Sequence, residues 1–261
     1  MLRPVSNSVT QINLPALYFD KLMQLSAEEL RALLTGDRKE AAIWIRMAAV
    51  QGLAGAQLLL GRMLLAGEGV AENKPEALLW FQRAAGQGDA EAINMVGRCY
   101  ENGWGANADA TLAFTHFLRA ARLEHDWAQY NLGHCYLDGA GTARDAQQAF
   151  YWYGLAARQG HGRAMNLLGR CYEEGWGVAR DAEIAAGWYR KSAEAGYFRG
   201  QYNWACILAE AGHTALAGYW YLQAAETGAP NVRKAAVAAL LNSPDPQLNS
   251  YGLIAQAYGC G

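Results

Sequence analysis

The sequence predicts an all-α protein, an α/α superhelical solenoid of stacked helix pairs with atypical terminal caps. The first observation is a segment that recurs about every 36 residues, a period found in helical repeat proteins. The segment 164–178 has counterparts that begin at Ala128, Ala92 and Ala56, and a decayed copy opens at Gly200. The second observation is that Ala, Leu, Trp and Tyr supply most of the apolar residues, which suits closely packed helices better than sheets.

The charge pattern excludes several classes of partner. The formal net charge is −2 and is spread along the chain, so no basic patch indicates a nucleic acid. No run approaches the roughly 18 apolar residues of a membrane span, and the segment 1–8 lacks the apolar core of a secretory signal. We therefore expect a cytoplasmic protein without a membrane span.

Three cysteines, Cys99, Cys135 and Cys171, share one repeat position, and Cys206 lies one place earlier in its copy. Equivalent points on stacked repeats lie roughly 8–10 Å apart, beyond the Cα separation of about 7 Å that a disulfide allows. We expect small buried thiols in a reducing compartment, with Cys260 a loose thiol in the tail.

The chain opens with residues 1–15, which show no periodicity and are expected to form a mobile arm. A short apolar helix is expected over 16–25. A capping box at the start of the segment 26–55 predicts a helix that ends near Gly36. Asp37 then caps the second helix of this shortened opening copy.

Four full copies follow, within a solenoid expected to span residues 16–241. They cover 56–91, 92–127, 128–163 and 164–199. In each copy a first helix of about eleven residues ends at a Gly-x-Gly, because glycine supplies the left-handed conformation that ends a helix. A polar residue then caps the second helix; these residues are Asn73, Asp109, Asp145 and Asp181.

Each second helix carries small and aromatic residues at steps of three and four, which places them on one buried face. Its tryptophans are therefore expected in the core; they are Trp44, Trp80, Trp152, Trp188 and Trp220. The second copy differs at two positions. His116 replaces the tryptophan, and Glu124 replaces the glycine that follows the other second helices.

A partial copy over 200–231 and a closing helix over 232–241 complete the predicted stack. Pro244 breaks this helix at the start of the tail, 242–261. Apolar residues at helical spacing in the tail predict a short capping helix that shields the exposed end of the stack. They are Leu248, Tyr251, Ile254 and Tyr258.

These signals resemble Sel1-like repeats, a subclass of the tetratricopeptide-type helical repeats. The resemblance covers about residues 40–228 and implies an α/α superhelix whose first helices line a concave groove. It also implies a role in protein–protein interaction. The positions that carry it are Leu168-Gly169-x-x-Tyr172, Gly175-x-Gly177-Val178, Asp181, Trp188-Tyr189 and Ala193-x-x-Gly196, with their counterparts in the other copies.

The resemblance further implies which residues face the groove, since steps of three and four make one stripe along each first helix. The expected partner-binding residues are Glu91, Asn94, Arg98, Glu101, Trp127, Tyr130, His134, Arg163, Asn166, Arg170, Glu173, Arg199 and Tyr202. Arginine can fork onto carboxylates, and tyrosine gives contact area at low entropic cost. The alternative is that Arg98–Glu101 and Arg170–Glu173 are ordinary ion pairs on solvated helix faces.

Trp104 and Trp176 stand between the two glycines of their loops. Such a tryptophan either anchors a partner from an exposed position or, more commonly, folds back across the neighbouring repeat.

Signals for chemistry are weak. The Gly-x-Gly loops follow helices and lack the Lys-Ser/Thr of a phosphate-binding loop. The five histidines show no zinc-ligand spacing, and no Gly-x-Ser-x-Gly or Cys/His pair indicates a nucleophile. We therefore expect no metal, no cofactor and no catalysis.

The leading hypothesis is a non-catalytic adaptor or scaffold that holds another protein or a peptide in its groove. A regulator or neutralising partner of a dedicated effector protein has the same appearance in sequence. A hydrolase is less favoured: disulfide-rich relatives have been linked to β-lactam binding or hydrolysis, but they pair two cysteines in each repeat, and here a repeat has at most one. The partner and the oligomeric state stay open.

Overall fold

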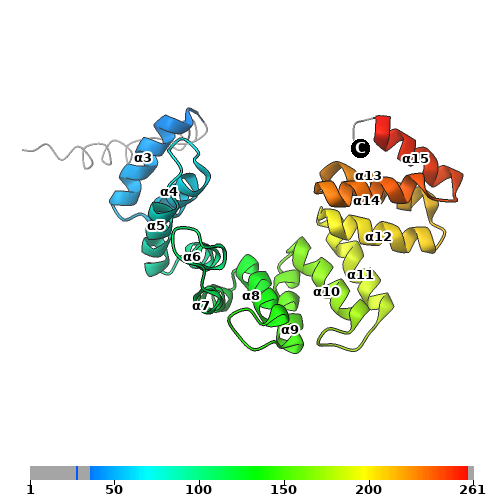
Figure 1. Cartoon of the computed structure of the whole chain (residues 1–261), viewed down its shortest axis with the longest axis horizontal. Coiled ribbons are helices and arrows are strands. Elements are labelled where there is room, and N and C mark those ends of the chain that lie inside the picture. Colours follow the sequence, from blue (N-terminus) through cyan, green and yellow to red (C-terminus); the bar gives the residue numbers. More distant parts are fainter. Residues whose placement is uncertain (1–27, 29–35, 258–261) are drawn as a thin grey trace, which may run out of the picture. The chain divides into compact units, whose positions relative to one another are not determined.

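The computed structural model describes residue 28 and residues 36–257, and every regular element in this part of the chain is an α-helix. The helices are α3 (Arg38–Val50), α4 (Ala54–Ala66), α5 (Lys74–Gly86), α6 (Ala90–Asn102), α7 (Ala110–Arg122), α8 (Asp126–Asp138), α9 (Ala146–Arg158), α10 (Gly162–Glu174), α11 (Ala182–Glu194), α12 (Phe198–Glu210), α13 (Thr214–Thr227), α14 (Pro230–Leu241) and α15 (Pro246–Ala257). They follow one another as packed pairs (Figure 1), which confirms the predicted all-α helical solenoid.

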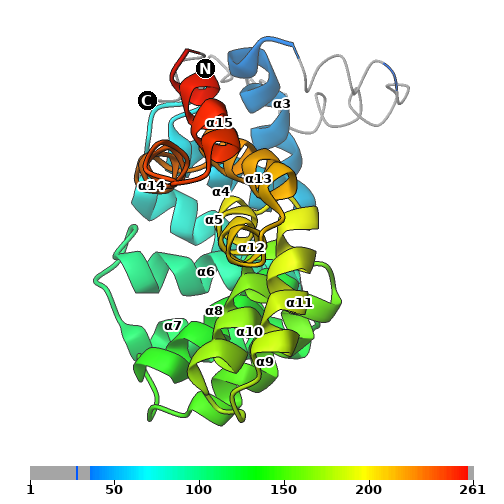
Figure 2. The same cartoon turned by 90° about the vertical axis from the view of Figure 1, so that its right-hand side faces the viewer.

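The chain divides into two compact units, Met1–Asp109 and Ala110–Gly261. The first contains α3–α6, with contacts from α3 to α4, α4 to α5 and α5 to α6. The second contains α7–α15, in which α8 packs on α9, α10 on α11 and α12 on α13. Figure 2 shows α10 and α11 side by side in this second unit.

Some expectations fall where the structure gives no description. The arm expected over 1–15 and the helix expected over 16–25 lie outside the described residues, as do Cys260 and all of 26–35 except Glu28. Asp37 is described, and its carboxylate accepts the backbone N–H of Lys39 as the predicted N-cap.

The first helix of each full copy starts two residues before the alanine that marks the repeat. Its N-cap is Asp89 in α6, His125 in α8 and His161 in α10, and each side chain accepts a backbone N–H three residues on. Each of these helices ends, as predicted, at a glycine in the left-handed conformation, with φ of 68° at Gly103 and 78° at Gly175.

The second glycine of each loop fixes the contact to the preceding repeat. An added Cβ on Gly177 would lie 2.1 Å from the carbonyl oxygen of Ala146, and one on Gly141 would lie 2.1 Å from the carbonyl oxygen of Ala110. Both glycines also have positive φ. The loop therefore rests on the first turn of the preceding second helix, and a side chain at this position would separate the two repeats.

The two helices of a pair approach closely at a glycine on the first helix. An added Cβ on Gly133 would lie 2.4 Å from the ring of Tyr153, and one on Gly169 would lie 2.8 Å from the ring of Tyr189. Both tyrosines are fully or nearly fully buried. The ring fills the space that the missing side chain leaves, so each helix pair is held at one distance.

The core prediction for the helix tryptophans was only partly right. Trp44 and Trp80 are buried, but Trp152, Trp188 and Trp220 are half-exposed, and the tyrosine next to each is the buried ring. The reason is register: the glycine of the first helix faces the tyrosine, and neighbouring residues on a helix point about 100° apart. Trp188 instead stacks under the ammonium group of Lys191, 4.3 Å from its ring centroid.

Buried glutamines link one repeat to the next, which sequence periodicity did not indicate. The amide of Gln57 donates to the carbonyl of Ala49 and accepts from Gln87 at 2.8 Å. Gln129 repeats this arrangement two copies later: its amide donates to the carbonyl of Ala121 and accepts from Gln159. Because a buried amide must be satisfied, these bonds favour one register between successive helix pairs.

The C-terminal end is closed by two helices. The predicted closing helix is α14, it ends before the prolines, and α15 packs on both α13 and α14. An added Cβ on Gly218 of α13 would lie 2.3 Å from the ring of Tyr251 in α15, so the cap uses the same glycine-to-ring contact. Leu248 is buried as expected, but Ile254 is 44% exposed and does not cover the end; Tyr258 lies outside the described residues.

Replacing Gly133 with alanine tests the contact within a pair. The new methyl group overlaps the ring of Tyr153, so Gly133→Ala should lower the free energy of unfolding by about 1–3 kcal/mol, measured by urea denaturation. Gly187→Ala is the matched control, because this helical glycine has open space around it and alanine should stabilise by about 0.5–1 kcal/mol. Equal effects of the two changes would contradict the contact.

Glu124 adopts φ of 61°, the left-handed conformation that Gly88 and Gly160 adopt at equivalent positions. A non-glycine residue there carries strain of about 1–2 kcal/mol. Glu124→Gly should therefore raise the free energy of unfolding by roughly 0.5–1 kcal/mol after the entropy of the unfolded glycine is subtracted. Gly160→Ala, whose Cβ meets nothing within 4 Å, should lower the same quantity. A neutral or destabilising Glu124→Gly would show that the strain is absent.

Candidate functional site

The first helices of three successive repeats in the C-terminal unit surround one open cavity of about 360 Å³. It lies between α8, α10 and α12, and α11 and α14 complete its wall; α10 contacts α12, and α12 contacts α14. The lining residues are Tyr130, His134, Arg163, Asn166, Leu167, Arg170, Glu173, Tyr189, Tyr197, Arg199, Tyr202, Asn203 and Val232.

Eight of the thirteen residues that the sequence predicts at the partner-binding surface line this cavity. They are Tyr130, His134, Arg163, Asn166, Arg170, Glu173, Arg199 and Tyr202. Trp127 is exposed on α8 and touches the cavity through Arg163. The remaining four lie on α6 in the N-terminal unit; they are Glu91, Asn94, Arg98 and Glu101.

Two of the arginines are held in place by aromatic rings. The Cζ atom of Arg163 lies 5.0 Å from the ring centroid of Trp127 and 5.7 Å from that of Tyr197, so the guanidinium has a ring on each of two neighbouring repeats. Arg170 lies over the ring of Trp176 at 4.6 Å. Stacking restrains the guanidinium plane and leaves its N–H groups available along the edge.

The carboxylate in the cavity is engaged by a tyrosine. Glu173 accepts a hydrogen bond from the hydroxyl of Tyr189 at 2.5 Å, and this bond together with burial raises the pKa of Tyr189. None of the ion pairs between described residues joins Arg170 to Glu173 or Arg98 to Glu101. Burial raises the pKa of Glu101 and Arg98 acts in the opposite direction, so the two side chains of that pair interact without direct contact.

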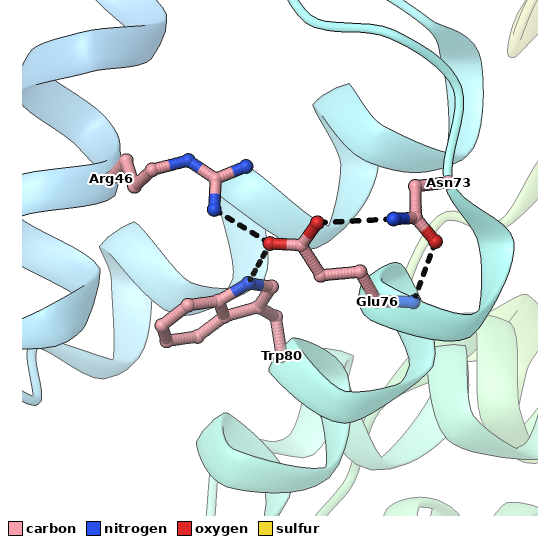
Figure 3. Close-up of polar contacts among 4 residues, drawn as sticks. All are labelled: Arg46, Asn73, Glu76 and Trp80. Atoms are coloured by element: carbon pink, nitrogen blue, oxygen red, sulfur yellow. Dashed lines mark hydrogen bonds and ion pairs between the residues drawn. The ribbon is translucent and has the colours of Figure 1, made fainter.

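The N-terminal unit presents a different picture, because several of its arginines pair with glutamates of the next repeat. Arg62 forms an ion pair with Glu91, one of the predicted site residues. Figure 3 shows Arg46 of α3 reaching Glu76 of α5 at 2.6 Å, with the indole N–H of Trp80 donating to the same oxygen. The Arg46 hydrogen bond holds the pKa of Glu76 below its usual value. These pairs neutralise charge within the unit.

The face of α6 carries the other predicted residues. Asn94 is buried to the same extent as its counterpart Asn166 in α10. Arg98 stacks on Trp104 at 5.2 Å, the same pairing that Arg170 makes with Trp176 two repeats later. The arginine and the loop tryptophan thus form a unit that recurs in alternate copies.

The sequence matches the Sel1 repeat family over residues 54–89, 90–125, 128–161, 162–197 and 214–228, which together make up more than half of the chain. The chain belongs to the Sel1 repeat family. No curated protein matches the sequence.

Solved structures carry the same fold. A Sel1 repeat protein from Oxalobacter formigenes superposes with a TM-score of 0.77 at 26% identity, over 89% of this chain and 100% of that one. A protective antigen of uropathogenic Escherichia coli with an SLR fold gives 0.69 at 25% identity; it covers 94% of this chain, which spans 56% of the antigen's length. An immunity protein from Pseudomonas aeruginosa gives 0.51 at 18% identity, over 76% of this chain and 74% of that one, and shows the shared fold alone.

The loop tryptophans of these Sel1 repeats, Trp104 and Trp176, are half-buried, and each lies beneath an arginine of its own repeat's first helix. Trp176 also packs against a core cluster that contains residues of α9, in the preceding repeat, as the packed alternative expects. Both rings support an arginine, and in the C-terminal unit that arginine lines the cavity.

Five residues that line the cavity were not predicted from the sequence to bind a partner. Tyr189 belongs to the core stripe of a second helix, Tyr197 precedes α12, and Val232 lies on the closing helix α14. Leu167 and Asn203 fall between the predicted stripe positions of α10 and α12. A signal for Asn203 was present, because it repeats Asn131 and stands one place after the stripe tyrosine. In the structure its amide donates to Asn166 at 2.9 Å and joins α12 to α10.

An aromatic cluster forms one side of the cavity. Tyr130 lies 4.7 Å from His134 and 4.9 Å from His161, measured between ring centroids. Burial raises the pKa of Tyr130, whereas Arg163 and Arg199, which line the same cavity, act in the opposite direction. Burial lowers the pKa values of His134 and His161, which keeps both rings neutral at pH 7.

The cysteines have the character of core residues. Cys99, Cys135 and Cys171 are buried and form no disulfide among the described residues, and Cys206 is half-buried. Burial raises the pKa of Cys99 to about 11 and that of Cys171 to about 12, which disfavours a nucleophilic thiolate.

Among the described residues, no cluster of three or more His, Cys, Asp or Glu side chains is arranged to hold a metal ion. None of the described helices is long and apolar enough to cross a membrane.

Acid should weaken the fold through His161. Its Nδ1 accepts the backbone N–H of Ala164 as an N-cap, and its folded pKa lies below the usual 6.5, so protonation is less favourable in the folded chain. Stability from this group is complete above about pH 6.5 and is lost as the pH falls towards the depressed pKa. The free energy of unfolding should therefore decline below about pH 6.5.

His161→Asn keeps a capping acceptor and removes the titrating ring, so its stability should depend less on pH, by up to about 1.4 kcal/mol per pH unit. His161→Ala removes both and should lie about 1 kcal/mol below the asparagine variant at pH 8. Urea denaturation between pH 5.5 and 8 gives the comparison. Parallel curves for the wild type and His161→Asn would refute the assignment.

Proposed function

We propose that this Sel1 repeat protein is a non-catalytic interaction module that holds a partner protein or peptide in the cavity between α8, α10 and α12. The observation that carries the proposal is a set of stacked arginines and tyrosines that converge on an open cavity and are not consumed by ion pairs among the described residues. Arginine and tyrosine are enriched among residues that dominate binding energies at interfaces.

The cavity has the rigidity that binding requires. The glycine-to-ring contacts at Gly133 and Gly169 hold two of its wall helices, α8 and α10, each against its own second helix. The hydrogen bond from Asn203 to Asn166 ties two of these helices together. A preformed surface loses little conformational entropy when a partner binds, so more of the contact energy appears as affinity.

The size of the cavity favours a segment over a folded domain. About 360 Å³ lies at the lower end of ligand cavities in proteins, roughly 300–1,000 Å³, and holds a few side chains. A partner would therefore insert a short stretch of chain. An adaptor and a neutralising partner of an effector would use the same contact, so the identity of the partner decides between these two roles.

A photoreactive residue at the cavity tests the proposal in cells of the native host. Tyr197, which lines the cavity, is replaced by p-benzoylphenylalanine, and Tyr151, half-exposed on α9 outside it, is the matched control. Irradiation should cross-link one partner at position 197 and not at 151, identified by mass spectrometry. Adding Arg170→Glu should reduce the cross-link at least tenfold with helix content unchanged by circular dichroism, whereas Arg158→Glu should not.

The proposal fails if both positions give the same cross-linked proteins. It also fails if Arg170→Glu leaves the yield at position 197 unaltered, because the cavity would then play no part in capture.

A further inference from the structure

The charges of the cavity are unbalanced. Arg163, Arg170 and Arg199 line it together with one carboxylate, and Glu173 already accepts the hydroxyl of Tyr189. Among the described residues, no ion pair engages any of the three arginines. A guanidinium gains most from a carboxylate, which accepts two parallel N–H bonds with charge assistance. The cavity thus lacks the anions that its own arginines would bind best.

The arginines lie at two ends of the cavity. Arg163 and Arg199 occupy the first turns of neighbouring first helices and line the cavity together with Tyr130. Arg170 follows Arg163 by seven residues on α10, which corresponds to about 10 Å along the helix axis. An extended chain in the polyproline II conformation covers this distance in about three residues, at roughly 3.1 Å each, and its three residues per turn place residues i and i+3 on one face.

An apolar strip separates the two cationic ends. Leu167 lies between Arg163 and Arg170 on α10, and Val232 of α14 faces the same cavity. A guest with an aliphatic side chain between two acidic residues would bury that side chain here. Such a guest satisfies both the charges and the apolar surface.

We infer that the partner segment is an extended acidic peptide, with two carboxylates three residues apart that bind Arg163/Arg199 and Arg170 and an aliphatic residue between them. This inference rests on the proposed function and adds the chemistry of the guest. A long polyanion such as a nucleic acid is less suited, because the chain as a whole carries a net charge of −2 and repels it.

Fluorescein-labelled octapeptides test the inference on the full chain by fluorescence anisotropy. The probe is Gly-Ser-Glu-Leu-Ala-Glu-Ser-Gly, and its amide counterpart carries Gln for both Glu. The acidic peptide should bind at least tenfold more tightly than the amide peptide, and the difference should shrink between 50 and 300 mM salt. A peptide with adjacent glutamates, Gly-Ser-Leu-Glu-Glu-Ala-Ser-Gly, should bind more weakly than the probe.

Variants link the effect to the cavity. Arg163→Gln and Arg170→Gln should each reduce the affinity for the acidic probe about tenfold and leave that for the amide peptide little changed. Arg158→Gln, the same charge change on exposed α9 outside the cavity, should have no effect. Urea denaturation verifies that the variants are folded.

Three results would overturn the inference: equal binding of acidic and amide peptides, equal binding of the two glutamate spacings, or a preference for peptides with phosphoserine in place of both glutamates. In each case a specific cross-link at position 197 would leave the proposed function standing. The segment cross-linked there provides a second check by tandem mass spectrometry. A segment without Asp or Glu contradicts the inference, and one with two acidic residues three apart supports it.

Discussion

The structure depends on one recurring contact, a helix glycine that receives an aromatic ring of the helix packed against it. In the C-terminal unit Gly133 receives Tyr153, Gly169 receives Tyr189, and Gly218 receives Tyr251 at the closing end. Because there is no side chain between ring and backbone, the contact sets the distance within each pair. The Gly-x-Gly loops then set the distance to the preceding repeat. Together they turn a short sequence pattern into a stack of helix pairs.

That stack determines what the first helices can display. The glycine-to-ring contact occupies one face of such a helix. The neighbouring stripe of residues takes no part in that contact and can contact other groups. Alternate copies use it differently: Arg98 and Arg170 rest on loop tryptophans, whereas Tyr130 joins an aromatic cluster. In the C-terminal unit the two kinds of copy alternate around one cavity, which places arginine next to tyrosine. The N-terminal unit instead pairs arginines with glutamates of adjacent repeats, as Arg62 does with Glu91.

The fold was predictable because each of its signals is local. Caps at Asp37 and Asp181, and left-handed glycines such as Gly103 and Gly175, lie where the period places them. It was harder to predict which ring of each second helix is buried. Trp188 and Tyr189 are both apolar aromatics, and the tyrosine is the buried one because it is the ring that faces Gly169. The family resemblance, with helical spacing, pointed to eight of the residues that line the candidate cavity, but not to those from α11 and α14. Which residues of α11 and α14 reach the cavity depends on how neighbouring repeats pack together. The repeat pattern describes a single copy and carries no information about that packing.

The central claim is that the first helices, rather than the second, present the surface that receives another polypeptide. Hydrogen–deuterium exchange of the chain alone and in complex with its cross-linked partner measures this directly. The account predicts slower exchange over α8, α10 and α12, strongest around Arg163 and Arg170, and little change on the exposed sides of α9, α11 and α13. Protection confined to α9, α11 and α13 would contradict it, since the guest would then lie on the opposite surface of the repeats.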